Sequence, residues 1–346
     1  MPRTIFSALI LVAIAISGCG GNSDERGGAQ DQTDGVSAVE ERYKVIDDLY
    51  DREASNDEKL AASMDFLGEY PESEHTIELV QDVIYFRGEE KGDWDGVITF
   101  AEGIRSKVKD SAMAVQFDRQ LIDWYGRAGM KEKMIAITGT LEDKGIIRFG
   151  DYFNAIEGAI SMKEWALARD YCARAGPKAT AVTWRAEWPD VKASDERAEK
   201  AGLNRQGMIL IKDSWALANQ GELDAALAGF ERAKSMVDVS YIGIPSYDLN
   251  NYWGKALLNH GDAKGAMDIF APGALIAHDE EAIEGLKTAY VSAYGGTDGY
   301  DAWGKAKRAA IARTADDFDL PDSAGTRHTF NSLRGKVTLL NFWSPT

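Results

Sequence analysis

The residues best suited to chemistry in this chain of 346 residues are its two cysteines and four histidines. The histidines lie far apart in the sequence and lack the spacing of a zinc site. They are His75, His260, His278 and His328. An unpaired cysteine raises the question of a reactive thiol, but Cys172 falls at an apolar position of an expected helix. A buried free cysteine behaves as a small hydrophobe, so we expect Cys172 to belong to a core, and we expect no metal or other cofactor.

Two further patterns look functional and are set aside. Residues 299–305, Gly-Tyr-Asp-Ala-Trp-Gly-Lys, have the spacing of a phosphate-binding loop, but Ala306 follows where Ser or Thr is required, and the flanks are helical. The acidic residues of segment 278–281 are typical of the first turn of a helix, where carboxylates meet the positive end of the helix dipole. We therefore assign no catalytic residue within the chain.

Cys19 belongs to an N-terminal targeting signal. Arg3 precedes an apolar run over residues 5–16, and this run is shorter than the roughly 20 residues that span a bilayer. Residues 16–19, Ile-Ser-Gly-Cys, closely resemble the lipobox of bacterial lipoproteins, where cleavage leaves a lipidated cysteine as the first residue. The resemblance implies a signal peptide over 1–18 and lipid attachment at Cys19. The alternative is an ordinary signal peptide that ends beside a cysteine.

The lipobox resemblance also implies a location and a partner. The protein is expected in the cell envelope, facing the periplasm or the exterior and held in the lipid bilayer by acylated Cys19. Gly20, where inner-membrane retention would favour Asp, suggests the outer membrane if the cell has one. Residues 19–37 are mostly Gly, Asp, Gln and Ser, and this composition buries too little apolar surface to order itself. We expect a flexible tether there.

The negative charge of the chain argues against polyanionic partners. A net charge of -17 repels nucleic acid and anionic lipid headgroups, so neither is expected as a ligand. The content of 27% charged and 45% hydrophobic residues is typical of a soluble protein. The length exceeds what one hydrophobic core usually serves, so more than one structural unit is expected.

The middle of the chain, residues 38–313, is predicted to be helical. Apolar residues recur at spacings of three and four, and strand-like alternation is nearly absent. The first expected helices cover residues 38–53, 57–70, 76–88 and 94–108.

An internal repeat organises these helices. A turn glycine is followed by small, aromatic and small residues in the pattern of the second helix of a tetratricopeptide repeat. In the clearest copy these are Gly221, Ala226, Phe230 and Ala233. Gly261, Ala266 and Phe270 repeat the offsets, and a third copy places Cys172 at the aromatic position.

The repeat predicts how the helices pack. Turns are expected at positions 92, 129, 163, 221 and 261, with a long insertion after the third. Small residues such as Gly254 let the helices approach closely, and the aromatic residue fills the gap to the next hairpin. We therefore expect a mainly α fold, a tetratricopeptide-like α-solenoid. An irregular helical bundle is the alternative. A solenoid would bind proteins or peptides, or would act as a spacer.

The C-terminal residues 314–346 predict the first strands of another domain. Residues 337–343 form a nearly continuous apolar run, typical of a strand that is covered on both faces. Turn residues precede the run, and residues 327–330 are expected to form a short partner strand. A C-terminal hairpin that caps the helical region is the alternative.

Three ordered motifs in this stretch resemble the start of the TlpA-like and redoxin branch of the thioredoxin superfamily. They are Asp-Phe-Asp-Leu-Pro-Asp at 317–322, Leu-Arg-Gly-Lys-Val at 333–337 and Asn341-Phe342-Trp343. In that family the redox motif Cys-x-x-Cys follows two or three residues later, about where this sequence stops. Pro345 and Thr346 depart from the more usual Thr-Trp or Ser-Trp.

The thioredoxin-like resemblance implies an incomplete α/β domain and a thiol-disulfide oxidoreductase of the TlpA and redoxin type. Its redox motif is expected beyond Thr346, its redox partner is unknown, and these 346 residues should be inactive in a thiol-disulfide assay. One alternative is a non-catalytic scaffold that binds proteins or peptides through its repeats. A further alternative is a redoxin-type peroxidase.

Overall fold

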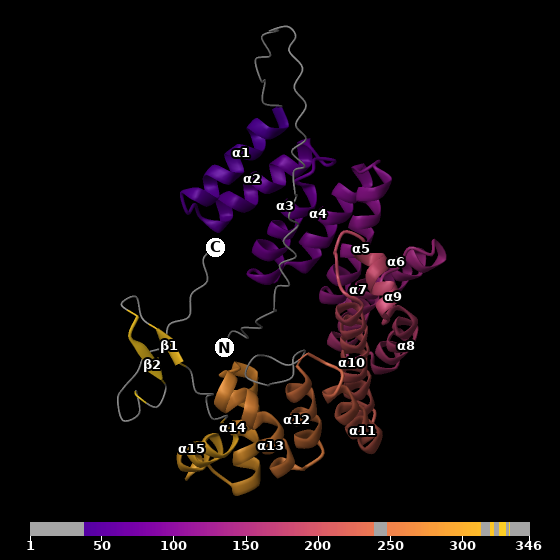
Figure 1. Ribbon diagram of the computed structural model, residues 1–346. Helices are drawn as coiled ribbons and strands as arrows, with labels where there is room; N and C mark the ends of the chain where they lie inside the picture. The colour runs from indigo at the N-terminus through magenta and orange to yellow at the C-terminus, as the bar shows by residue number, and fades with distance from the viewer. Residues whose placement is uncertain (1–37, 239–247, 313–318, 322–324, 330–331, 333–346) are drawn as a thin grey trace.

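The computed structural model describes residues 38–238, 248–312, 319–321, 325–329 and 332. Within these residues the fold is mainly α, as the sequence predicts (Figure 1). The first helices are α1 (Ala38–Asp51), α2 (Asn56–Glu69), α3 (Thr76–Val83), α4 (Trp94–Lys107), α5 (Ser111–Arg127), α6 (Lys131–Asp143), α7 (Phe149–Ser161) and α8 (Trp165–Ala175). They are followed by α9 (Ala181–Glu187), α10 (Asp195–Asn219), α11 (Leu223–Lys234), α12 (Leu249–Asn259), α13 (Ala263–Pro272), α14 (Glu280–Tyr294) and α15 (Tyr300–Ile311).

The first four predicted helices are confirmed to within two residues at nearly every end. Helix α2 begins with a capping box, in which the Ser55 hydroxyl accepts from the Glu58 N–H and the Glu58 carboxylate accepts from the Ser55 N–H. The third helix differs from the prediction in one respect, because its last turns over Ile84–Glu89 are π-helical. A π-helical turn accommodates one extra residue.

All five predicted turns are confirmed. Positions 92, 129, 163, 221 and 261 have φ of 71°, 69°, 60°, 89° and 86°, respectively. In four of these turns, the residue after the turn donates its N–H to the carbonyl five residues earlier, which closes the preceding helix. Four of the positions are glycine, which has no Cβ to oppose a positive φ. Lys163 adopts the same conformation without that freedom.

The small and aromatic positions pack as the repeat predicts. A Cβ on Gly254 of α12 would lie 2.6 Å from the ring of Phe270, and a Cβ on Gly285 of α14 would meet the same ring at 2.6 Å. Phe270 therefore fills the space between two successive hairpins. Phe230 does the same by stacking on Trp253, with ring centroids 6.0 Å apart.

The long interval between the third and fourth turns contains one added helix and a lengthened one. Helix α9 packs on the N-terminal half of α10, where Gly202 faces the backbone of Ala181 closely. Arg205 of α10 is buried there, with its guanidinium 2.6 Å from Glu187 and above the ring of Phe149. The inserted residues therefore add to the hairpin formed by α10 and α11, because α9 packs on the N-terminal half of α10.

From α5 onward the hairpins follow one another along a curved path (Figure 1). The first helices of successive hairpins are α5, α7, α10, α12 and α14. The first four of them pack against their own second helix and also against the next hairpin, and α14 packs against α12 and α13 of the preceding hairpin. Buried apolar side chains form clusters in sequence order, from α1 to α8 and then from α10 to α12 and from α12 to α15. Among the described residues, no helix is long and apolar enough to cross a membrane.

The C-terminal part of the described chain contains an antiparallel strand pair. Strand β1 (Asp319–Pro321) pairs with β2 (Arg327–Thr329), and Leu320 lies opposite His328. Strand β2 therefore matches the predicted strand 327–330 over 327–329, but its partner is β1, and residue 330 and the apolar run 337–343 lie outside the described residues. Leu320 is 61% exposed, so this pair does not cover the helices as a packed cap.

Candidate binding surface

A buried lysine lies where three first helices meet. The side chain of Lys212 in α10 is only 3% exposed, and its Nζ lies 2.5 Å from a carboxylate oxygen of Glu157 in α7. The same Nζ donates to the hydroxyl of Tyr252 in α12 at 3.0 Å. The ammonium group also lies above the rings of Tyr252 and Phe153, 4.3 and 5.7 Å from their centroids. Its charge is therefore shared by one anion and two aromatic faces.

The environment keeps Lys212 protonated. Loss of solvent lowers the pKa of Lys212, but the Glu157 carboxylate and the Tyr252 hydroxyl outweigh this, and the pKa ends above its ordinary value. Burial is the main cause that raises the pKa of Tyr252. A lysine held in its charged form is a poor nucleophile. Glu157 is 37% exposed, so the carboxylate is the member of the ion pair that reaches the surface.

The polar contacts continue from α12 to α14. Asn251 of α12 donates to carboxylate oxygens of Asp279 and Glu281, both at 3.2 Å. Lys255, one helical turn further along α12, pairs with Glu281. The first helix of this hairpin is thereby tied to the start of the next one.

A further group of charges lies on α5. Asp123 of α5 accepts from Arg127 at 2.9 Å, and Arg127 also pairs with Glu89. Desolvation raises the pKa of Asp123; Arg127 opposes this shift, while Glu89 and Glu157 add to it. We call this line of polar side chains on the first helices the charged seam. It consists of Asp123, Glu157, Lys212, Asn251, Tyr252, Lys255 and Glu281.

A pocket opens beside the seam, between the C-terminal ends of α10 and α12. Its volume is about 250 Å³. The lining residues are Trp215, Ala218, Asn219, Gly221, Ala256, Asn259 and His260. Trp215 joins the pocket to the seam, because its ring lies 5.3 Å from that of Tyr252 and 6.3 Å from that of Trp165, measured between centroids.

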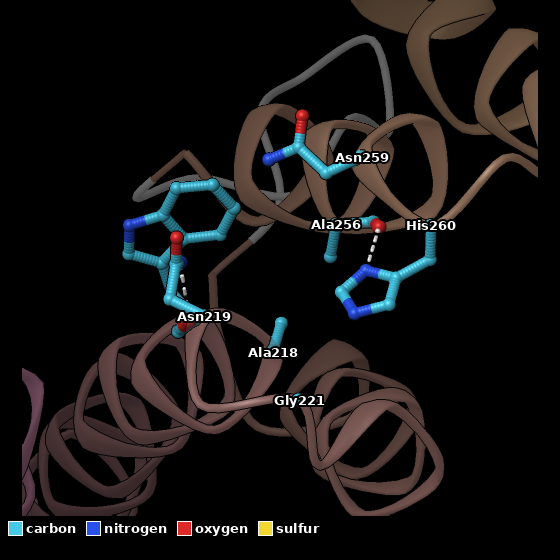
Figure 2. Close-up of a pocket in the computed structure, with 7 residues that line it drawn as sticks. Ala218, Asn219, Gly221, Ala256, Asn259 and His260 are labelled. Carbon is cyan, nitrogen blue, oxygen red and sulfur yellow. Dashed lines mark hydrogen bonds between the residues drawn. The ribbon is translucent and has the colours of Figure 1, made fainter.

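The pocket combines an aromatic wall with amide and imidazole groups. Figure 2 shows the ring of His260 extending from the end of α12 toward the end of α10. Its Nδ1 lies 2.9 Å from the carbonyl oxygen of Ala256. Because a carbonyl only accepts, Nδ1 carries the proton of this bond. Asn219 and Asn259 offer side-chain amides of the kind that hydrogen-bond to a peptide backbone.

The charged seam was not among the sequence predictions, although the repeat register contains a signal for it. Asp123, Glu157, Trp215 and Lys255 each precede their turn position by six residues. Lys212 and Tyr252 each precede theirs by nine residues. An alignment of the repeats on their turns would have placed these side chains on one face of the array.

The predicted core role of Cys172 is confirmed. The residue is buried, and its thiol points to the carbonyl of Ile209 in the next hairpin, with a sulfur to oxygen distance of 3.8 Å. Burial raises the pKa of the thiol well above its ordinary value, which makes it unreactive. The other predicted site residues lie outside the described residues. They are Cys19, Asn341, Phe342, Trp343, Pro345 and Thr346.

The patterns set aside in the sequence behave as expected. Most of the segment resembling a phosphate-binding loop, residues 300–305, lies in α15 and follows the helix α14 rather than a strand. Asp279 caps α14 by accepting from the N–H of Ala282 at 2.7 Å. The histidines lack metal-ligand spacing in the sequence, but the fold brings His75 close to Glu40 and Glu74.

A comparison with solved structures gives a distant likeness. No family model matches the sequence. No curated protein matches it either. A solved structure of a tetratricopeptide repeat protein from Parabacteroides merdae is 13% identical, with a TM-score of 0.37. The matched region covers 73% of this chain and 98% of that one.

Proposed function

We propose that this protein is a tetratricopeptide-like scaffold that binds a protein or peptide segment along the charged seam and the adjoining pocket. Successive hairpins in such an array create an extended surface, and each hairpin adds contacts to it. The observation that carries the proposal is the buried Lys212, which joins Glu157 and Tyr252 of the neighbouring hairpins.

The chemistry of the seam favours binding over simple packing. A buried ion pair adds little stability compared with apolar side chains of similar volume. Trp215 and the amides beside it supply an aromatic anchor and hydrogen-bonding groups, the combination found at the centres of protein interfaces. The seam also presents both charge signs, which would set the register of a bound segment.

Selection from a displayed peptide library by the purified full chain tests the scaffold proposal. We expect selected peptides to lose at least about tenfold in affinity with Trp215→Ala and with Glu157→Gln. Glu132→Gln, an exposed residue of the second helix α6, is the matched control and should bind as the wild type does. Failure to select any peptide, or selected peptides that bind all variants equally, would contradict the proposal.

We further propose that the scaffold is a lipid-anchored protein of the cell envelope. The support is the Ile-Ser-Gly-Cys sequence at residues 16–19, which follows a short apolar run. Several acyl chains on Cys19 would anchor the chain stably. The Cys19→Ala variant should leave the membrane fraction, whereas Cys172→Ala should stay in it. Membrane retention of Cys19→Ala would refute the anchor.

A second candidate function is thiol-disulfide exchange by a thioredoxin-like domain that begins in residues 314–346. The β1–β2 pair favours it, because two short strands with exposed side chains suit the edge of a larger sheet. A thiolate would attack a substrate disulfide, and a second cysteine would resolve the mixed disulfide. The coding sequence after Thr346 tests the candidate.

Three outcomes separate the alternatives. A Cys-x-x-Cys motif would support the oxidoreductase, and the longer product should then reduce insulin while these 346 residues do not. A lone cysteine in a Thr-x-x-Cys setting would support a peroxidase. A stop codon would leave the scaffold as the function.

A further inference from the structure

Three potential metal ligands converge where α1 meets the start of α3. Glu40 lies in α1, and Glu74 and His75 immediately precede α3. One ligand atom from each of the three side chains lies within 4.8 Å of the other two. The Nε2 atom of His75 is 3.3 Å from a carboxylate oxygen of Glu40. Among the described residues, this is the group of three His, Cys, Asp or Glu side chains whose ligand atoms all lie this close together.

The imidazole is held in place by its neighbours. The ring of His75 stacks on that of Tyr43, with centroids 3.4 Å apart and planes inclined by 8°. Its backbone N–H donates to the hydroxyl of Ser73 at 3.2 Å. The side chain is 18% exposed, so the nitrogen that faces Glu40 lies at the rim of the packed region. A ligand whose ring orientation is fixed loses little freedom when it binds an ion.

The spacing matches a small divalent cation. Zinc binds imidazole nitrogen and carboxylate oxygen at about 2.0 to 2.2 Å, and tetrahedral ligand atoms are therefore about 3.4 Å apart. The measured distance between His75 and Glu40 is close to that value. Glu74 is exposed, and its carboxylate lies within 4.8 Å of the ligand atoms of Glu40 and His75.

The surroundings of the cluster are acidic. The carboxylates of Glu78, Asp47 and Asp82 act electrostatically on Tyr43, on whose ring His75 stacks. Glu78 also accepts from the Tyr43 hydroxyl at 3.5 Å. Negative charge thus gathers around the cluster from both α1 and α3. A divalent cation would offset this repulsion.

We propose that Glu40, Glu74 and His75 form a zinc-class metal site that fastens α1 to the start of α3. A set of one imidazole and two carboxylates suits Zn²⁺ or Mn²⁺ and is unlike the all-oxygen sites of Ca²⁺ and Mg²⁺. The ion would link two segments that are about 35 residues apart in the sequence and would stabilise the end of the array by mass action.

Calorimetric titration of the chelator-treated full chain with zinc chloride tests the site. We expect one saturable equivalent, and we expect Glu74→Gln and His75→Ala each to weaken binding at least about tenfold. Glu74→Gln is the sharper variant, because Glu74 is exposed and its replacement leaves the packing intact. Glu132→Gln makes the same change at an exposed glutamate of α6 and is the matched control, expected to bind as the wild type does.

Amide hydrogen exchange tests whether the ion links α1 to the start of α3. Zinc should slow amide hydrogen exchange in α1 of the wild type and of Glu132→Gln, but not in Glu74→Gln. Absence of saturable binding up to on the order of 100 µM zinc would overturn the proposal. Binding that is equal in Glu74→Gln and wild type would also overturn it, because the ion would then occupy another place.

Discussion

Lys212 is a charged side chain at a position where sequence periodicity leads one to expect packing. It shares its place in the repeat with Tyr252, and the two side chains meet directly. The charge is tolerated because Glu157 and two aromatic faces replace the water that burial removes. Cys172 shows the opposite case, since a residue with reactive chemistry is used there only for its volume.

Replacing Lys212 should separate the contribution of packing from that of charge. Lys212→Ala removes the contacts with both rings and leaves Glu157 unpaired, so we expect a loss of about 1 to 3 kcal/mol in the free energy of unfolding. The double variant Lys212→Met, Glu157→Gln keeps the volume and removes both charges, and it should recover most of that loss. Urea unfolding followed by circular dichroism measures the three proteins. Equal stability of Lys212→Ala and wild type would show that the seam lysine does not support the fold.

The pH dependence of this contribution has a definite sign. Because the pKa of Lys212 is raised in the folded protein, its contribution is complete below the unfolded pKa of about 10.4 and falls as pH rises through the folded pKa. The stability difference between wild type and the double variant should therefore be constant from about pH 7 to pH 9. In more alkaline solution, the wild type should lose stability relative to the double variant.

Close approach of helices is decided at single glycines. Gly254→Ala places a methyl group 2.6 Å from the ring of Phe270, and such overpacking should cost about 1 to 3 kcal/mol of unfolding free energy. Gly139→Ala in α6 is the control, because no atom lies within 4 Å of its added Cβ. That variant should gain about 0.5 to 1 kcal/mol from its better helix propensity. Thermal unfolding compares the two, and a neutral Gly254→Ala would contradict the described packing.

Two opposite substitutions at the hairpin turns test the cost of a positive φ. Lys163 has φ of 60° at a position where the other turns carry glycine. Lys163→Gly should raise the unfolding free energy by about 0.5 to 1 kcal/mol, because the left-handed conformation is strained for a side chain. Gly221→Lys, at φ of 89°, should lower it by about 1 to 2 kcal/mol. Both are measured by denaturant unfolding, and shifts of the same sign would refute this reading of the turns.

The whole molecule is a linear array in which stability is built from neighbour contacts. Central hairpins pack on both sides, whereas the end helices pack on one. In α15 the described burial is limited to Gly304, while α7 buries residues along most of its length. Such arrays open more easily at their ends than in the middle.

Hydrogen exchange should follow this order along the array. We expect amide protection to be highest in α7, α8 and α10 and lowest in α1 and α15, because local opening requires less buried surface to be exposed at the ends. Exchange measured by mass spectrometry on the full chain checks this prediction. Uniform protection from α1 to α15 would indicate one cooperative unit instead of an array.

The repeat could be predicted from the sequence because its signals are local. A turn glycine, the small residue five positions later and the aromatic residue nine positions later are all within one hairpin, and each acts through sterics. The π-helical turn at Ile84–Glu89 and the added helix α9 were not predicted, because tertiary packing determines them. Lys163 shows that the turn persists even without glycine.

The helical hairpins, their turn positions and the core role of Cys172 follow from the amino-acid sequence, since helix periodicity and backbone sterics depend on residues near one another in the chain. Which charges meet depends instead on how the hairpins pack in three dimensions. Glu157 and Lys212 are on different hairpins, as are Lys212 and Tyr252, and Glu40 meets His75 across two helices. Coulombic and hydrogen-bond contacts act over a few ångströms of space, and the superposition of successive hairpins sets those distances.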